Sequence, residues 1–283
     1  MASADFVKYE AFGNDMIVAD PAHFHQPLEP PFIIRLCDRH RGIGADGICY
    51  GPLPGKPHPS MRFFNPDGSE AEKSGNGLRI FARYLWDAGY VTDKRFNIAI
   101  GGDVLPVTIL DQTASRVAMG MGGLSFQSTA VGMRGAARAV VGEQLVVGDR
   151  TATITAVSVG NPHCVVFTEA LETIKDWGAR LEQAPVFTNR TNVQLVAVQS
   201  RSRIRIAIWE RGAGYTLASG TSACAAAGAA IRNGYCDSPV SVEMAGGTAT
   251  VAIDHDWYAT LTGEVSAVYR GTLSSELLRQ SEK

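Results

Sequence analysis

The chain has 283 residues and carries one short pattern twice, and this repeat limits its possible folds more than any other feature. The sequence SGNG at residues 74–77 is followed by an apolar helical pattern that closes at Gly89-Tyr90. The sequence SGTS at residues 219–222 is followed by a similar pattern that closes at Gly234-Tyr235. The distance from the serine to the closing glycine is the same in both copies, which indicates a duplicated unit.

A second pair of matching loops supports the duplication. Gly13-Asn14 precedes Ser74 by nearly the same distance as Gly160-Asn161 precedes Ser219. We therefore expect two similar halves that meet near residue 118. The predicted N-terminal half is 1–117, joined by 265–283, and the predicted C-terminal half is 118–264.

The order of apolar patterns predicts an α+β fold rather than strict alternation of strands and helices. Alternating apolar residues predict strands at 195–199 and 204–208, and residues 242–253 predict a hairpin that turns at Gly246-Gly247. Helical patterns are few and well separated, at 77–88, 170–182 and 221–233. The fold we expect is two pseudo-symmetric α/β halves around a central cleft.

Charge and composition exclude several classes of partner. Lys plus Arg is 26 and Asp plus Glu is 28, so there is no basic excess for nucleic acid or an anionic membrane. The longest small-apolar stretch, 223–231, is far too short to span a bilayer, and no secretory signal is visible. The five cysteines lack a CxxC pair, which argues against a zinc site or a disulfide framework and predicts a cytoplasmic protein.

No cofactor or metal is expected. The glycines of GIGADG lack the spacing of a nucleotide-binding loop, and the remaining histidines lack metal-ligand spacing.

Each half is expected to present a helix start to the cleft. Free N–H groups at Gly75-Asn76 and Gly220-Thr221 can bind a carboxylate, because helix N-termini favour anions. Ser74 and Ser219 place a short side chain on each side of that ligand. Such a site suits chemistry on both faces of an α-carbon, so the expected partner is a small-molecule amino acid.

Several motifs occur in a fixed order along nearly the whole chain. They are Gly13-Asn14-Asp15, DRHRGIGADG (38–47), FNPDGSEAE (64–72), GNG (75–77), GNPH (160–163), Asn192-Val193, ERGAG (210–214) and Gly220-Thr221. In these motifs the chain resembles the diaminopimelate epimerase family. The resemblance implies a homodimer of two-half subunits. It also implies an isomerase, independent of pyridoxal phosphate, that converts LL- to meso-diaminopimelate for lysine and peptidoglycan synthesis.

The resemblance also implies a mechanism with two cysteines, one removing the α-proton as a thiolate and one delivering a proton to the opposite face. Ser74 and Ser219 stand at these two cysteine positions. A hydroxyl is a far weaker acid than a thiol, so serine in place of cysteine at these two positions is expected to remove most of the proton-transfer rate. Ile80 and Tyr215 also differ from the cysteine and glutamate of many relatives.

The expected ligand-binding residues are retained. By resemblance, the distal carboxylate of diaminopimelate is held by Asn65, Asn161, Asn192 and Arg211. Glu210 contacts the distal amine, and the pocket is completed by Asn14, Gly75, Asn76, Gly220 and Thr221. His163 and Glu210 resemble the residues beside the two catalytic thiols, so the expected catalytic residues are Ser74, Ser219, His163 and Glu210.

Two other functions remain open. In the first, a divergent isomerase or lyase uses His163 or Glu210 as its general base, as relatives in the proline racemase and phenazine-isomerase groups use fewer thiols or a carboxylate. In the second, the chain binds an amino acid without catalysis, through the same helix starts and Arg211.

Overall fold

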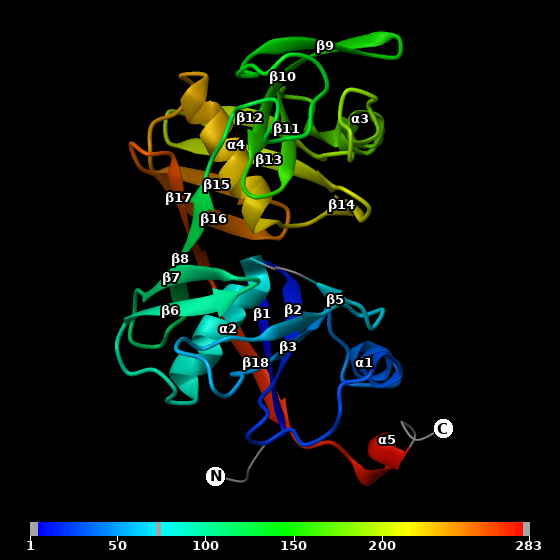
Figure 1. Ribbon diagram of the computed structural model, residues 1–283, viewed down its shortest axis with the longest axis vertical. Helices are drawn as coiled ribbons and strands as arrows, with labels where there is room; N and C mark the ends of the chain where they lie inside the picture. The colour runs from blue at the N-terminus through cyan, green and yellow to red at the C-terminus, as the bar shows by residue number, and fades with distance from the viewer. Residues whose placement is uncertain (1–4, 72–74, 280–283) are drawn as a thin grey trace. The chain divides into compact units, whose positions relative to one another are not determined.

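The computed structural model describes residues 5–71 and 75–279, and the chain divides into two compact units (Figure 1). Unit 1 comprises Met1–Met119 and Gly263–Lys283, and unit 2 comprises Gly120–Thr262. The chain passes between the units within strands β8 (Arg116–Gly123) and β17 (Tyr258–Glu264). Each unit combines mixed β-structure with a few separated helices, so the predicted α+β class is confirmed.

Unit 1 contains a six-stranded sheet in the order β18-β1-β2-β3-β4-β5. Its strands are β1 (Phe6–Ala11), β2 (Asn14–Ala19), β3 (Ile48–Tyr50), β4 (Arg62–Phe64), β5 (Glu70–Ala71) and β18 (Ser266–Gly271). β1 and β2 form a hairpin whose turn residues Phe12 and Gly13 have φ of 57° and 78°. Two positive φ angles are what a type I′ turn requires, and this turn sets the position of Asn14.

The rest of unit 1 packs around helix α2 (Gly75–Asp87). Leu78, Phe81 and Leu85 recur at the spacing of one helical face and are completely buried. The hairpin of β6 (Arg95–Ile100) and β7 (Asp103–Ile109) continues into β8 and contributes to the same core. The other helices of this unit are α1 (Pro30–Cys37) and α5 (Ser275–Arg279).

Unit 2 is built on a longer sheet in the order β17-β16-β15-β13-β12-β11-β10-β9, with β14 added beside β13. Its strands are β9 (Glu143–Val147), β10 (Arg150–Ser158), β11 (Pro162–Phe167), β12 (Asn192–Ser200), β13 (Arg203–Glu210), β14 (Gly214–Thr216), β15 (Val240–Met244) and β16 (Gly247–Ile253). Ile204, Ile206 and Ile208 are buried while Arg203 and Arg205 are exposed, so the predicted strand is confirmed.

Helix α4 (Gly220–Arg232) packs on this sheet, and the side chains on its buried face are small. Its alanines from Ala223 to Ala230 are completely buried. A Cβ atom built on Gly228 would lie 2.4 Å from the Leu124 side chain, so a larger residue at this position would force Leu124 to shift. The other helical segments of unit 2 are η1 (Leu171–Thr173) and α3 (Ile174–Glu182).

The two units repeat one order of elements. In unit 1 an antiparallel pair, β1–β2, is followed by α1, the parallel strand β3, the antiparallel β4 and β5, and α2. In unit 2 the antiparallel pair β10–β11 is followed by α3, the parallel strand β12, the antiparallel β13 and β14, and α4. Both α2 and α4 have 13 residues, and both follow the repeated serine motif, so the duplicated halves are confirmed.

Helix α1 was not among the predicted elements. It is a short apolar run that begins with two prolines, and in sequence such a run is typical of a loop. Prolines are nevertheless accepted in the first helical turn, whose N–H groups have no partner within the helix. Among the described residues, 5–71 and 75–279, no helix has both the length and the apolar character to cross a membrane.

Candidate active site

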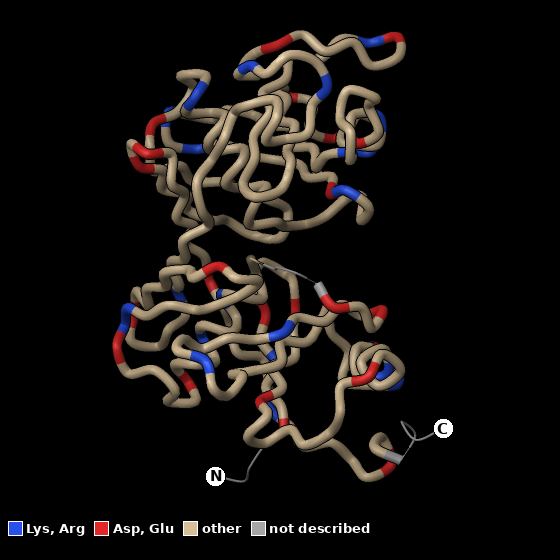
Figure 2. The backbone as a smooth tube through the Cα atoms, viewed as in Figure 1, with Lys and Arg blue, Asp and Glu red and all other residues tan. Residues whose placement is uncertain are grey.

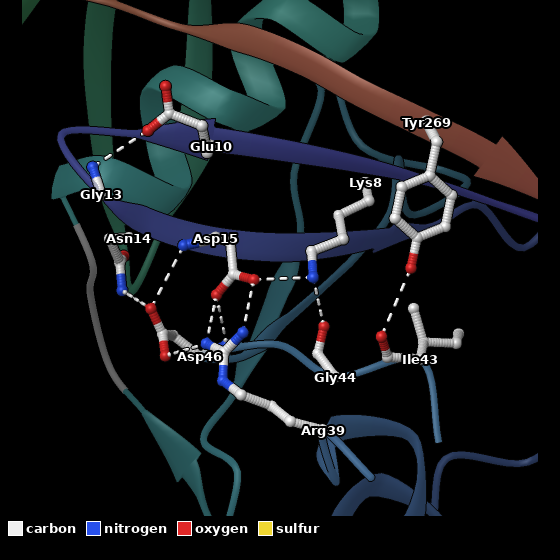
Figure 3. A network of polar contacts seen from close by, with 10 residues as sticks. All are labelled: Lys8, Glu10, Gly13, Asn14, Asp15, Arg39, Ile43, Gly44, Asp46 and Tyr269. Atoms are coloured by element: carbon white, nitrogen blue, oxygen red, sulfur yellow. Dashed lines mark hydrogen bonds and ion pairs between the residues drawn. The ribbon is translucent and has the colours of Figure 1, made fainter. Parts of the chain in front are cut away.

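Asn14 begins β2, and a network of charged residues in unit 1 holds its side chain (Figure 3). Asn14 Nδ2 donates to Asp46 Oδ2 at 3.0 Å. One Arg39 nitrogen lies 2.7 Å from Asp46 and 2.6 Å from Asp15. Lys8 Nζ lies 2.6 Å from the other oxygen of Asp15.

Burial alone raises the pKa of Asp15, but hydrogen bonds from Arg39 and Lys8 outweigh burial and hold that pKa well below its usual range. Asp15 is therefore a fixed anion at neutral pH. Its backbone N–H also donates to Asp46, so the anion and its partners fix the residue that precedes it, Asn14.

Asn65 closes the turn between β4 and β5. Its Nδ2 donates to Ser69 Oγ at 3.0 Å, and its backbone N–H donates to the Ser69 carbonyl at 2.8 Å. These contacts stay within one turn, so they give Asn65 a local structural role.

Gly75 and Asn76 form the first turn of α2, as predicted. The Asn76 side chain is buried and accepts from Arg79 Nη2 at 2.6 Å. The Arg79 guanidinium lies 4.6 Å from the centre of the Phe12 ring, which links the helix start to the turn before Asn14. The side-chain oxygen of Asn76 is therefore committed to Arg79. Ser74 lies outside the described residues.

His163 is completely buried on β11, next to Asn161. Its Nε2 lies 2.9 Å from Asn161 Oδ1. Burial lowers the pKa of His163 to about 3, a hydrogen bond with Gln194 opposes this, and the positive charge of Arg211 lowers the pKa further. The imidazole is therefore neutral at pH 7, and it is poorly suited to hold a proton taken from a substrate.

Asn192 and Arg211 are joined directly. Asn192 is paired with His163 across the parallel strands β12 and β11, and its Nδ2 donates to the Pro162 carbonyl at 2.9 Å. Its Oδ1 accepts from the Arg211 backbone N–H at 2.9 Å. Asn192 thus ties the loop that carries Arg211 to β11, while the exposed Arg211 guanidinium donates to the Asn189 carbonyl at 3.1 Å.

Glu210 ends β13 at the hairpin with β14. Thr216 Oγ1 donates to Glu210 Oε2 at 3.2 Å, across a register in which Glu210 faces Gly214. Tyr215 is 43% exposed and lies under Lys175 in a cation–π contact. It therefore provides no second carboxylate beside Glu210.

Glu182 is a site residue that the sequence analysis missed. It is 4% exposed at the end of α3, and its carboxylate accepts from Trp209 Nε1 at 2.8 Å and from the Gly212 N–H at 2.9 Å. Arg190 completes the set at 3.0 Å. A buried carboxylate with three donors fixes the ERGAG loop, yet a glutamate at the end of a helical pattern carries no signal of this role in sequence.

Ser219 is the N-cap of α4, as expected for the residue before a helix start. It is 7% exposed, and its Oγ accepts from the Ser222 backbone N–H at a long 3.5 Å. Thr221 Oγ1 lies at the same distance from Ser219 Oγ. Gly220 and Thr221 follow as the first two helical residues, so the expected unit 2 residues gather on α4 and the neighbouring strands.

No described cysteine takes the place of a catalytic thiolate. All five are free and buried. Burial raises the pKa of Cys37 and of Cys164 to about 12 each, and it also raises the pKa of Cys49 and Cys236. These thiols stay protonated at neutral pH and serve as apolar core residues.

Basic and acidic positions are interspersed along the backbone of both units (Figure 2). Neither unit gathers a long single-sign run near the residues described above.

The sequence matches known proteins over most of its length. A family model described as diaminopimelate epimerase matches residues 6–126 and 155–268. The chain is 46% identical to diaminopimelate epimerase 2 of Nostoc sp. over 275 residues, 96% of each chain. It is 37% identical to diaminopimelate epimerase of Synechococcus elongatus, covering 96% of this chain and 98% of that one.

Solved structures share the fold at much lower identity. A protein from Pseudomonas aeruginosa described as a predicted epimerase has a TM-score of 0.66 at 16% identity, over 96% of this chain and all of that one. A hydroxyproline epimerase from Agrobacterium vitis has a TM-score of 0.65 at 11% identity, over 95% and 90%.

Proposed function

The chain belongs to the diaminopimelate epimerase family, and we propose that it binds an amino acid of the diaminopimelate type and moves the proton on its α-carbon without a cofactor. The reaction is a 1,1-proton transfer that converts the LL form to the meso form. One group takes the α-proton, a second group gives a proton to the opposite face, and the substrate is otherwise unchanged.

The observation that carries this proposal is the retained set of polar residues at one end of the unit 2 sheet. Asn161, Asn192 and Arg211 are held there by hydrogen bonds to neighbouring strands and loops. An Arg fork and amide N–H groups suit a carboxylate, and Glu210 suits an ammonium group. In unit 1 we assign ligand-binding roles to Asn14, Asn65 and the backbone of Gly75 and Asn76.

Ser219 is the residue in unit 2 that we assign to proton transfer, with Ser74 as its counterpart in the repeat. A serine hydroxyl is not ionised at neutral pH without an adjacent base. The start of α4 can stabilise an anion at Ser219, but its hydroxyl already accepts a hydrogen bond as the helix cap. We therefore propose that proton transfer in this chain is slow.

The test is α-proton exchange with solvent deuterium, followed by NMR, for LL- and meso-diaminopimelate. We expect binding by calorimetry, slow exchange by the natural chain, and exchange faster by about 10²–10⁴-fold in the Ser74→Cys/Ser219→Cys variant. Ser266→Cys, at an exposed serine of β18, is the control and should not change the rate. Absence of binding to either stereoisomer would contradict the proposal.

A second candidate is binding of the amino acid without turnover. The capping role of Ser219, the protonated thiols and the neutral His163 favour it, because each removes a possible base. Binding without exchange in both the natural chain and the double cysteine variant would support this candidate. Exchange by the natural chain that is lost in Glu210→Gln would instead identify a carboxylate base.

A further inference from the structure

Four polar side chains of unit 2 lie in a row, three of them fully buried and the fourth, Asn161, partly exposed. Two of them, Gln194 and Ser222, lie outside the motifs quoted for the family resemblance. Asn161 directly precedes β11, His163 lies near its start, Gln194 lies on β12, and Ser222 lies on the first turn of α4. His163, Gln194 and Ser222 are each 0% exposed. Buried polar atoms of this kind need partners, so the positions of their hydrogens are constrained.

The constraint begins at the imidazole. His163 Nε2 lies 2.9 Å from Asn161 Oδ1, and with the Asn161 amide in this orientation its oxygen can only accept, so Nε2 carries a hydrogen. The ring is buried and neutral, and a neutral imidazole has one N–H. Nδ1 is then an acceptor that faces the Gln194 side chain, which interacts with the ring, but no described residue makes a hydrogen bond of good geometry to Nδ1.

Gln194 is the side chain that interacts with this ring and with α4. Its Nε2 is placed 3.0 Å from Ser222 Oγ, and its Oε1 is buried with no partner among the described residues. In that orientation both Gln194 Oε1 and His163 Nδ1 are acceptors without donors. Rotating the Gln194 side-chain amide by a half-turn exchanges its oxygen and nitrogen without changing its shape, and it gives both acceptors a donor. Gln194 then donates to His163 Nδ1, and the Ser222 hydroxyl donates to Gln194 Oε1.

We infer that Gln194 and Ser222 are positioning residues that keep His163 in its Nε2–H tautomer, so that the Asn161 N–H groups face the ligand as carboxylate donors. Donation passes along one direction, from Ser222 through Gln194 and His163 to Asn161. Because His163 occupies Asn161 Oδ1, the amide N–H groups remain for the ligand. The inference rests on the proposed function for the ligand class, a carboxylate, and it rests on the described contacts for the tautomer.

The row of side chains also reaches the residue assigned to proton transfer. The Ser222 backbone N–H donates to Ser219 Oγ. Ser222 therefore contacts Ser219 through its backbone and Gln194 through its side chain. A change at Ser222 is therefore expected to affect both the imidazole and the start of α4.

A competing arrangement satisfies the same atoms in the opposite direction. If the Asn161 amide makes the half-turn, it donates to His163 Nε2, and His163 Nδ1–H donates to Gln194 Oε1. Asn161 then presents its oxygen to the ligand, which suits an ammonium group. The two arrangements differ in which imidazole nitrogen carries the hydrogen, and this can be measured directly.

The first experiment is long-range ¹H–¹⁵N correlation NMR on the full ligand-free chain, with the His163 ring identified by its loss in His163→Gln. We expect the Nε2–H tautomer from pH 6 to 8. The Nδ1–H tautomer would overturn the inference. This measurement needs no variant at positions 194 or 222, so a folding defect cannot affect it.

The second experiment compares Gln194→Glu with Gln144→Glu, an exposed glutamine on β9. A carboxylate at position 194 can only accept, so it should draw a hydrogen to His163 Nδ1 and weaken binding of meso-diaminopimelate about tenfold or more. Gln144→Glu should leave the tautomer and the affinity unchanged. Ser222→Ala should mix the two tautomers, because Gln194 loses the donor that orients it.

The outcomes separate this inference from the proposed function. No binding of meso-diaminopimelate by the natural chain counts against the proposed function, while the tautomer in the ligand-free chain still tests the positioning role. If Gln194→Glu changes the tautomer but binds the ligand as the natural chain does, the link from His163 to the ligand is refuted.

Discussion

The two copies of the repeated loop are held in place by different polar contacts, ion pairs in unit 1 and neutral hydrogen bonds in unit 2. In unit 1, Asn14 is fixed by the charged residues Lys8, Asp15, Arg39 and Asp46. In unit 2, the corresponding Asn161 is fixed by the neutral, fully buried His163. One backbone pattern can therefore be stabilised either by compensated charges near the surface or by uncharged donors and acceptors in the core, and the two solutions respond differently to mutation and acid.

The largest effect is expected from breaking the ion network of unit 1. Asp15→Asn leaves Lys8, whose side chain is 10% exposed, beside a neutral group. An uncompensated, largely buried charge is costly, so we expect a loss of about 2–4 kcal/mol in the free energy of unfolding. Urea titration measures the loss, and hydrogen exchange should place it in unit 1.

The control for this variant is Asp237→Asn, which breaks an ion pair with Arg201 in which both side chains are mainly exposed. Surface pairs contribute little, so no clear change is expected there. Equal destabilisation by the two substitutions would show that the unit 1 network is no more than a set of surface ion pairs.

Acid should weaken unit 2 before it weakens unit 1. The pKa of histidine is about 6.5 in an unfolded chain, and burial lowers that of His163 to about 3. Between these values the unfolded chain binds a proton that the folded chain does not, so stability falls as pH falls. The expected loss is roughly 2–3 kcal/mol between about pH 6.5 and pH 4.5.

Asp15 contributes in a lower pH range. Its folded pKa lies below the value of about 3.9 in the unfolded chain, so its stabilisation is present above that value and is lost as pH falls below it. His163→Gln should therefore flatten the stability profile between pH 6.5 and 4.5, while the exposed His255→Gln should leave it unchanged. An unchanged profile in His163→Gln would show that the ring is not held neutral.

The helices α2 and α4 differ in the size of the side chain at an equivalent position. At the ninth residue of each helix, α2 has Arg83 and α4 has Gly228. Gly228→Val forces its side chain into Leu124, so overpacking should cost about 1–3 kcal/mol in unfolding free energy. Arg83→Val is the matched substitution on α2, where the side chain is 14% exposed and paired with Asp87. It should be the milder of the two by thermal denaturation.

Sequence reasoning recovered the parts of the molecule that depend on local pattern. The paired SGNG and SGTS motifs predicted helices at 77–88 and 221–233, and the structure has α2 at Gly75–Asp87 and α4 at Gly220–Arg232. Alternating isoleucines predicted β13, and the hairpin predicted over 242–253 is present as β15 and β16, with its turn at Ala245-Gly246, one residue before the predicted Gly246-Gly247. The α+β class and the family followed from these patterns and motifs together.

The contacts that hold the site could not be predicted in the same way. Glu182 and Gln194 bind groups that are distant in sequence, and their roles depend on burial, which a single side chain type does not indicate. Helix α1 was missed because its prolines resemble a loop. The assigned roles of Asn14, Asn65, Glu210 and Arg211 remain predictions for binding measurements to test.

The smallest expected effect concerns the cap of α4 and sharpens the comparison at Ser219. Its Oγ receives the Ser222 N–H at 3.5 Å, a long hydrogen bond, so Ser219→Ala should cost only about 0.5–1 kcal/mol in unfolding free energy. Ser219→Gly should cost only a few tenths of a kcal/mol in unfolding free energy, because glycine is accepted at an N-cap. Thermal denaturation of the two variants measures the difference.

If both leave stability unchanged while α-proton exchange is abolished, the Ser219 hydroxyl serves the reaction and not the helix. If stability falls as expected and exchange is unaffected, Ser219 is a structural cap and proton transfer must be assigned to another group in unit 2.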